Sequence, residues 1–118
     1  MKGLSIHVVD VARGCVADGL ELRVERLEGE RRELIHAGRI GADGLLAGLA
    51  DEAGRCSAGV YEVSLRVADF YRAQGMVLPE PAFLDLLVYR FGIADTGQHY
   101  HLPFKLTAWG VSCFRGGA

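Results

Sequence analysis

Hydrophobic and polar residues alternate along several short segments of the chain, which is the pattern expected of half-buried β-strands. In residues 4–12, apolar and β-branched side chains occupy every second position and favour a strand. Residues 20–27 alternate again, with charged residues on the opposite face. The connection at residues 28–30 predicts a hairpin that returns as a third strand over residues 31–37. The first third of the chain therefore predicts strands that bury one face.

The second half of the chain continues this pattern. Residues 60–67 alternate, and residues 82–90 form an apolar run that is bounded by turn signals and short enough for a strand. Two last strands are predicted over residues 99–107 and 109–115. Between the two halves lies a glycine-rich stretch, where residues 45–47 are at most a short edge strand.

Residues 68–74 are the one segment predicted as a helix. Asp69 is placed as its N-terminal cap, and Gly75 as the glycine that ends it. The sum is seven or eight strands and one short helix, with no internal repeat and no linker. Strands at this spacing indicate an all-β fold in which two sheets form a sandwich.

Composition limits the size and the partners of the protein. A chain of 118 residues is a single domain, residues 1–118, and its 50% hydrophobic content is enough for a core. The net charge of -2 provides no electrostatic attraction for nucleic acid or for an anionic membrane, so we expect neither as a partner.

The cysteines and the N-terminus bear on the compartment. Three cysteines without a Cys-x-x-Cys pair predict neither a disulfide framework nor a zinc site. The first residues have no apolar core of a signal peptide, and no apolar stretch approaches the roughly 20 residues that span a bilayer. We therefore expect a cytoplasmic protein that does not enter the membrane.

Three histidines are the residues with the clearest chemical potential. His99 and His101 lie two apart in a predicted strand and so point to one face, and His7 lies in the first strand. Imidazoles that converge would suit general acid–base catalysis or a metal, although the spacing is also that of a structural or surface pair. The incomplete ligand set disfavours a metal, so no metal ligands are predicted. His36 is interpreted as a surface histidine at a strand end.

Two further side chains have a functional and a plain interpretation. Cys113 is either a reactive thiol or, as free cysteines usually are, a small buried hydrophobic residue. Arg115 would either bind a carboxylate or be a solvated charge near the C-terminus. Residue type and position do not decide between these alternatives.

Three segments of the chain are distinctive when taken together: Leu4-Ser5-Ile6-His7-Val8-Val9-Asp10, Ala42-Asp43-Gly44, and His99-Tyr100-His101-Leu102-Pro103 with the ending Phe114-Arg115-Gly116. They resemble one known family, the 5-hydroxyisourate hydrolases, which are the transthyretin-like proteins of purine catabolism. The resemblance covers nearly the whole chain. It implies a transthyretin-like sandwich of two four-stranded sheets with one short helix. It also implies a homotetramer, built as a dimer of dimers, with active sites along the dimer–dimer interface.

The resemblance implies a small-molecule substrate and a reaction. Proteins of that family hydrolyse a cyclic amide of 5-hydroxyisourate, without a metal or another cofactor. The family's catalytic histidines match His7 and His101. One neutral imidazole would deprotonate water, and a second protonatable group would assist departure of the ring nitrogen. We expect the substrate to lie among His99, Leu45, Arg115, Gly117 and Trp109.

The chain departs from the family pattern at two polar positions of the site. Leu45 stands where the family has a substrate-binding arginine, and Gly117 stands where it has a terminal serine. Three explanations are open: the substrate is more apolar, such as an N-methylated hydroxyisourate; the protein has become a non-catalytic binding protein; or Arg39 reaches the site instead.

Overall fold

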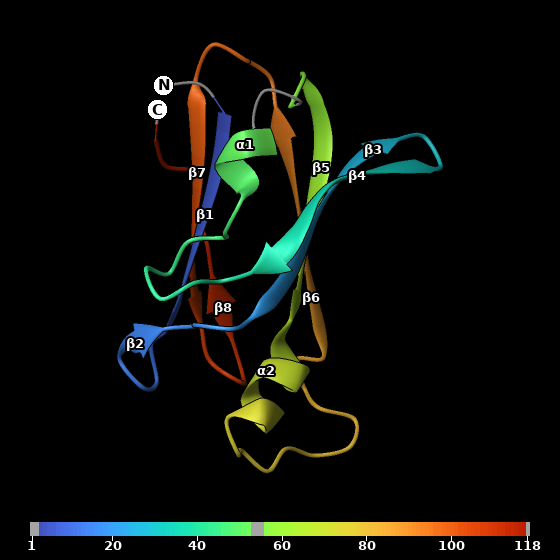
Figure 1. The fold of residues 1–118 in the computed structure, drawn as a ribbon. Coiled ribbons are helices and arrows are strands. Elements are labelled where there is room, and N and C mark those ends of the chain that lie inside the picture. The colour runs from blue at the N-terminus through green and yellow to red at the C-terminus, as the bar shows by residue number, and fades with distance from the viewer. Residues whose placement is uncertain (1–2, 53–55, 118) are drawn as a thin grey trace.

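The computed structural model describes residues 3–52 and 56–117. Within these ranges the chain forms eight strands and two helices (Figure 1). In chain order they are β1 (Gly3–Asp10), β2 (Cys15–Val16), β3 (Glu21–Glu28), β4 (Arg31–Arg39), α1 (Leu49–Glu52), β5 (Gly59–Arg66), α2 (Val67–Ala73), β6 (Leu86–Ile93), β7 (His99–Leu106) and β8 (Val111–Ser112).

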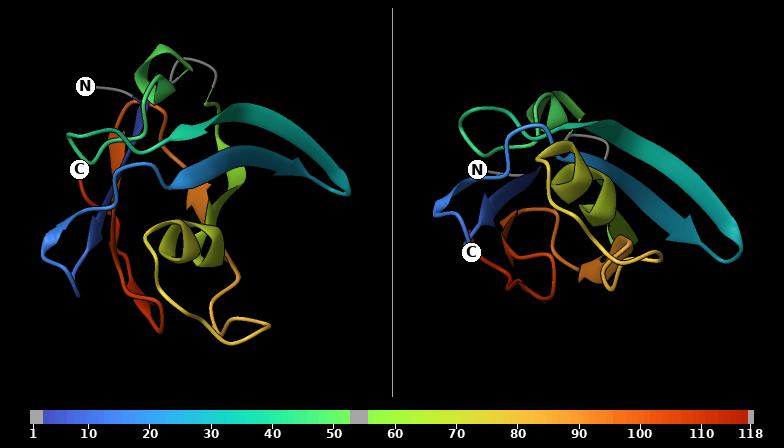
Figure 2. Two further views of the ribbon diagram at one scale, coloured as in Figure 1. Left: turned by 60° about the horizontal axis from the view of Figure 1, so that its bottom comes forward. Right: turned by 90° about the horizontal axis from the view of Figure 1, so that it is seen from below.

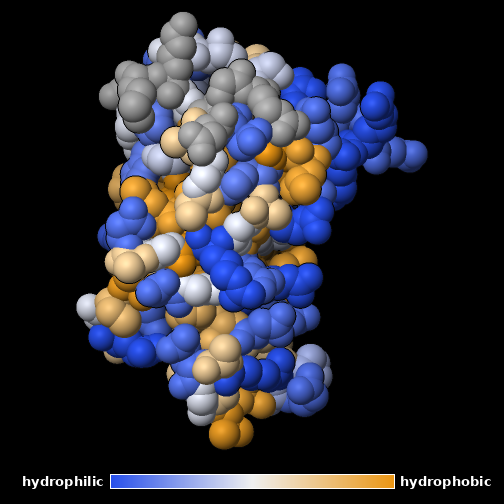
Figure 3. Space-filling model, in the orientation of Figure 1, coloured by the Kyte–Doolittle hydropathy of each residue, from blue (hydrophilic) through white to orange (hydrophobic). Residues whose placement is uncertain are grey.

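The strands form two four-stranded sheets, which confirms the predicted all-β sandwich. Sheet A has the order β2-β1-β7-β8, and sheet B has the order β4-β3-β5-β6. The pairing of β1 with β7 is parallel, whereas the other pairings are antiparallel. The two views of Figure 2 show the β3–β4 hairpin reaching beyond the sandwich. Its tip is hydrophilic (Figure 3), as the charged sequence predicts.

The core lies between the sheets because each long strand buries alternate side chains. In β1 the buried residues are Leu4, Ile6 and Val8, as the alternation predicts, and also Asp10. Beside them in the same sheet, β7 buries Tyr100, Leu102, Phe104 and Leu106. The remaining side chains of β1 and β7 therefore point to the outer face of sheet A.

Several element boundaries differ from the prediction. β6 begins at Leu86 and not at residue 82, because the chain after the prolines turns before it pairs with β5. β8 contains only Val111 and Ser112, and residues 45 and 46 make isolated bridges and no strand. The short strand β2 and the single turn α1 were not predicted. A turn rich in glycine has no periodicity from which such short elements can be predicted.

The predicted helix is α2, and its end is as expected while its start is not. Gly75 has a φ of 88°, and its N–H donates to the carbonyl of Arg72. Asp69 is not the cap: the N-cap position is Arg66, which makes no side-chain capping bond, and Asp69 lies in the first turn. The helix begins two residues before Asp69 because Val67 and Ala68 are buried, so packing sets its start.

Among residues 3–52 and 56–117, no helix has both the length and the apolar character needed to cross a membrane.

Candidate active site

The outer face of sheet A gathers the residues that the sequence singled out at its two ends. Ser5 pairs with His101 in the parallel register of β1 and β7, and His7 pairs with Pro103. Alternate residues of a strand share a face, so Ser5, His7, His99 and His101 all point outward from the same region of the sheet. The four side chains are half-buried. The structure therefore brings together the three histidines that sequence spacing alone left apart.

Ser5 connects two of these histidines, and the sequence analysis did not identify it. Its Oγ lies 2.8 Å from Nε2 of His99 and 2.7 Å from Nδ1 of His101. A hydroxyl has one proton, so it donates to one ring nitrogen and accepts from the N–H of the other. The sequence offered one sign that Ser5 belongs to the site, because Ser5 lies two residues before His7 on the same strand face. It did not show that the hydrogen-bond partners of Ser5 come from β7.

His101 has an altered acidity. Burial lowers the pKa of its imidazole below the ordinary value of 6.5, and the positive charges that His7 and His99 would carry lower the pKa further. The ring is therefore neutral at pH 7. A neutral imidazole with one ring nitrogen turned away from Ser5 has the chemistry of a general base.

Leu45 pairs with His7 of β1 through an isolated antiparallel bridge. The N–H of Val8 donates to the carbonyl of Gly44 at 2.9 Å, and the N–H of Leu46 donates to the carbonyl of Ile6 at 3.0 Å. These bonds make His7 and Leu45 a non-hydrogen-bonded antiparallel pair, in which the two side chains lie on one face and close together. An aliphatic side chain therefore lies beside His7.

The ring of His7 packs directly over Gly44. Gly44 has a φ of 82°, and a Cβ built on it would overlap the imidazole of His7. Glycine is therefore required here both by the backbone conformation and by the histidine. This residue belongs to one of the segments that carry the family resemblance, and its contact with His7 was not predicted.

The C-terminal segment covers the other two histidines. Gly116 pairs with His101 through two backbone hydrogen bonds of 3.0 and 2.7 Å. Gly117 follows with a φ of 77°, and a Cβ there would lie 3.0 Å from Cδ2 of His99 and 3.1 Å from Cβ of His101. Gly117 thus lies at the histidines, as expected, and contributes no side chain to them.

Two further residues expected at the substrate make the following contacts in the described part of the chain. The Arg115 guanidinium carbon lies 4.1 Å from the centre of the Tyr100 ring, and its Nη2 donates to Gln98 and to the carbonyl of His99. Trp109 follows the far end of β7, and its ring packs near that of Phe83. At about 3.3 Å per residue, the five residues from His101 to the end of β7 already span roughly 16 Å. Within one chain, Trp109 therefore lies apart from the histidines, whereas Arg115 reaches the backbone of His99.

Arg39, the residue considered as a substitute for an arginine at position 45, has its own partners in this structure. Its Nη2 forms an ion pair with Glu21 on sheet B, and its Nη1 donates to the carbonyl of Gly19. Within one chain, the guanidinium is therefore engaged by these two partners.

The remaining candidate residues have structural roles. His36 is half-buried and its Nε2 lies 2.6 Å from the carbonyl of Ala47, so it braces the segment that carries Leu45. Burial raises the pKa of the Cys113 thiol and keeps it protonated. In the part of the chain that the structure describes, no three or more His, Cys, Asp or Glu side chains are grouped so as to hold a metal ion.

Comparison with known proteins shows which family the chain is similar to. The sequence model of the HIUase/Transthyretin family matches residues 4–116. The chain is 42% identical over 113 residues to 5-hydroxyisourate hydrolase 2 of Rhizobium meliloti (strain 1021), covering 96% of this chain and 94% of that protein.

Two solved structures are similar in fold. The structure of Klebsiella pneumoniae 5-hydroxyisourate hydrolase has a TM-score of 0.77 at 27% identity and covers 97% of this chain and 98% of that one. Sea bream transthyretin in complex with thyroxine has a TM-score of 0.85 at 21% identity, covering 98% of this chain and 96% of that one, and this likeness concerns the fold alone. The match over residues 4–116 and the identity to the Rhizobium protein confirm the resemblance: the chain belongs to the HIUase/Transthyretin family.

Proposed function

We propose that this protein is a hydrolase that opens the cyclic amide ring of 5-hydroxyisourate or of an N-methylated hydroxyisourate. The observation that carries the proposal is the cluster in which Ser5 joins His99 to His101, beside His7. The relative in Rhizobium meliloti and the Klebsiella pneumoniae protein, both named as 5-hydroxyisourate hydrolases, support the same substrate class.

In the proposed mechanism His101 is the general base. Nδ1–H of His101 donates to Oγ of Ser5, and the Ser5 hydroxyl donates to Nε2 of His99. This direction of the two hydrogen bonds leaves Nε2 of His101 with its lone pair, because a neutral imidazole has only one N–H. Nε2 then takes a proton from a water molecule. Ser5 is therefore a positioning residue, which selects the tautomer and orientation of the base.

The bond changes of hydrolysis require a second group that can give a proton. The water oxygen forms a bond to the ring carbonyl carbon while its proton passes to His101. The carbon–nitrogen bond of the cyclic amide then breaks, and the nitrogen takes a proton from His7 in its protonated form. A proton passes from His101 through solvent to His7, which returns both imidazoles to their starting states. No cofactor enters this sequence.

The surroundings of His7 favour a less polar substrate. A charge-assisted hydrogen bond of an arginine contributes about 1.5–3 kcal/mol, and Leu45 makes none with its side chain. Gly117 offers no hydroxyl near His99. An N-methyl group removes a hydrogen-bond donor from the substrate and adds apolar surface, which matches an aliphatic neighbour of His7. We therefore place the N-methylated hydroxyisourates first among the substrates.

We also propose that the active protein is a cytoplasmic homotetramer, built as a dimer of dimers with the sites between subunits. The histidine cluster lies on an open sheet face, so a second subunit is needed to exclude water from it. The end strands β6 and β8 carry exposed apolar side chains, Val88 and Val111. Light scattering on a sizing column tests the assembly, and a monomer at micromolar concentration would contradict it.

A non-catalytic small-molecule binding protein is the second candidate function. The observation that favours it is that Leu45 and Gly117 lie at the histidines. Both residues lack the polar side chains that the family resemblance implies at these two positions. It would keep the sandwich and the histidines as a binding surface and lose the hydrolysis.

One assay decides between the two functions. Freshly generated 5-hydroxyisourate and its trimethylated analogue are each mixed with the protein, and loss of substrate absorbance is compared with the spontaneous rate. We expect acceleration of at least one substrate, and its loss in His101→Ala with substrate binding retained. If neither substrate is accelerated, the hydrolase proposal is wrong. If the unmethylated substrate turns over as fast or faster, only the preference for methylated substrates is wrong.

A further inference from the structure

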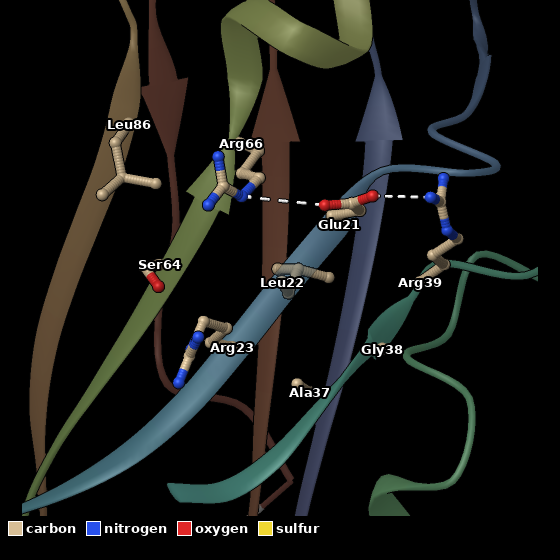
Figure 4. Close-up of a pocket in the computed structure, with 9 residues that line it drawn as sticks. All are labelled: Glu21, Leu22, Arg23, Ala37, Gly38, Arg39, Ser64, Arg66 and Leu86. Atoms are coloured by element: carbon tan, nitrogen blue, oxygen red, sulfur yellow. Dashed lines mark hydrogen bonds and ion pairs between the residues drawn. The ribbon is translucent and has the colours of Figure 1, made fainter. Parts of the chain in front are cut away.

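The outer face of sheet B contains a depression of about 340 Å³ with an excess of positive charge. Three arginines and one glutamate line it, whereas the protein as a whole has a net charge of -2. Figure 4 shows these side chains standing on β3, β4 and β5, with Leu86 of β6 at one side. The lining residues are Glu21, Leu22, Arg23, Ala37, Gly38, Arg39, Ser64, Arg66 and Leu86. This surface is on the other sheet from the histidine cluster.

The cross-strand rows explain why the surface is hollow at this point. Arg23 pairs with Ala37 on one side and with Ser64 on the other. Both neighbours have short side chains, so the long arginine stands beside an open space on the sheet. In the next row Glu21 lies between Arg39 and Arg66, and these longer side chains form the wall of the space (Figure 4).

Arg23 differs from the other arginines of this face because it has no carboxylate partner. Glu21 already binds Arg39 and lies 3.6 Å from Nε of Arg66. The other carboxylates of the face are also engaged: Glu25 and Glu62 with Arg32, Glu62 also with Arg90, and Asp69 with Arg66. Within the described ranges, no hydrogen bond or ion pair neutralises the Arg23 guanidinium.

We propose that this depression binds a small organic anion, with a phosphate or carboxylate group held by Arg23, the Ser64 hydroxyl and Arg66. The planar guanidinium presents paired N–H donors that match the oxygens of either group. Figure 4 shows Ser64 between Arg23 and Arg66. At about 30 Å³ per water molecule, 340 Å³ has room for on the order of ten heavy atoms. The body of the ligand therefore lies on Ala37 and Leu86, beyond the charged group.

A binding titration tests the site without any turnover. Phenyl phosphate, benzoate and inorganic phosphate are each added to the full-length protein at constant ionic strength, and backbone amide signals are followed by NMR. We expect saturable shifts at residues of β3 and β5 around Arg23 and Ser64. Phenyl phosphate and benzoate distinguish a phosphate ligand from a carboxylate ligand, and inorganic phosphate measures the contribution of the ligand body.

Matched variants assign the binding to the depression. Arg23→Gln should weaken the tighter probe about tenfold or more, because it removes a charge-assisted contact. Ser64→Ala should weaken it less. Arg31→Gln removes the same charge from the tip of the β3–β4 hairpin and should leave the affinity unchanged. The proposal is overturned if no probe saturates, if Arg23→Gln binds like the original protein, or if Arg31→Gln weakens binding equally. These outcomes leave the proposed hydrolase activity unaffected.

Discussion

The hydroxyl oxygen of Ser5 lies 2.7 Å from Nδ1 of His101, although the two residues are 96 positions apart in the chain. The parallel pairing of β1 with β7 creates this contact, since it sets Ser5 directly beside His101. The same oxygen lies 2.8 Å from His99. The tautomer of the proposed base thus depends on a side chain from the first strand of the protein.

Removing the Ser5 hydroxyl should slow hydrolysis more than it weakens binding. In Ser5→Ala, His101 loses the acceptor that holds its proton on Nδ1, so we expect kcat to fall roughly 10–100-fold with little change in KM. Ser5→Thr keeps a hydroxyl and should restore most of the rate. Ser112→Ala, on β8 of the same sheet, is the matched control. Equal loss in Ser5→Ala and Ser5→Thr would show that packing, and not the hydrogen bond, is what matters.

The acidic limb of the pH–rate profile should report His101. Because its folded pKa is lowered below 6.5, the base is deprotonated over more of the acidic range than a free histidine. On this limb we expect kcat/KM to rise with pH through a midpoint below 6.5. A midpoint above 6.5, measured in several buffers at one ionic strength, would contradict the environment described for His101.

The free energy of unfolding should also depend on pH through His101, and it should decrease as the pH falls. A histidine whose folded pKa is lowered contributes stability that is present above the unfolded value of about 6.5 and is lost as pH falls through the folded value. The free energy of unfolding, measured with urea, should therefore fall between pH 7 and pH 5. We expect this fall to be smaller in His101→Gln than in the original protein. An identical pH dependence in both proteins would remove His101 as a cause.

An arginine at position 45 should shift the substrate preference. Leu45 is 38% exposed and lies beside His7, so Leu45→Arg can be accommodated without burying a charge. We expect the ratio of kcat/KM for unmethylated over trimethylated hydroxyisourate to rise about tenfold or more, the equivalent of one charge-assisted hydrogen bond. Leu45→Met is the control for size. A ratio that moves equally in both variants would exclude the charge as the cause.

The contact between Gly44 and His7 can be separated from backbone strain. Gly44 and Gly14 both have positive φ, 82° and 69°, but a Cβ at Gly14 has no neighbour within 4 Å. Both glycine-to-alanine changes should cost about 1 kcal/mol of unfolding free energy through strain. Gly44→Ala should cost about 1–3 kcal/mol more through overpacking on His7 and should also reduce activity. Equal stability and activity of the two variants would contradict the close packing seen here.

Much of the sandwich was predictable because strand periodicity is a local property. The alternation around Leu4, Ile6 and Val8 is a consequence of burying one face, and it leaves His7 on the other face whatever the neighbouring strands are. The same argument correctly put His99 and His101 on one face. It could not predict the two-residue strand β2 or the turn α1, since elements this short show no period.

The family motifs carried the prediction of the site further than spacing did. Position 45 was expected at the site from its place in a motif, and its pairing with His7 gives that position a geometric reason. Arg115 and Trp109 were expected there too. Arg115 covers Tyr100 instead, because the segment that brings Gly116 to His101 turns its side chain to that ring.

The sequence by itself determined which residues face the core, which face solvent, and that three histidines lie on outward strand faces. Only the tertiary structure decided which of these residues meet. Ser5 and His101 become partners through the parallel register, Arg39 is held by Glu21, and Arg23 is left between Ala37 and Ser64. The physical reason is that burial follows from neighbours in the chain, whereas hydrogen bonds and ion pairs across a sheet depend on strand order and register, which local periodicity does not specify.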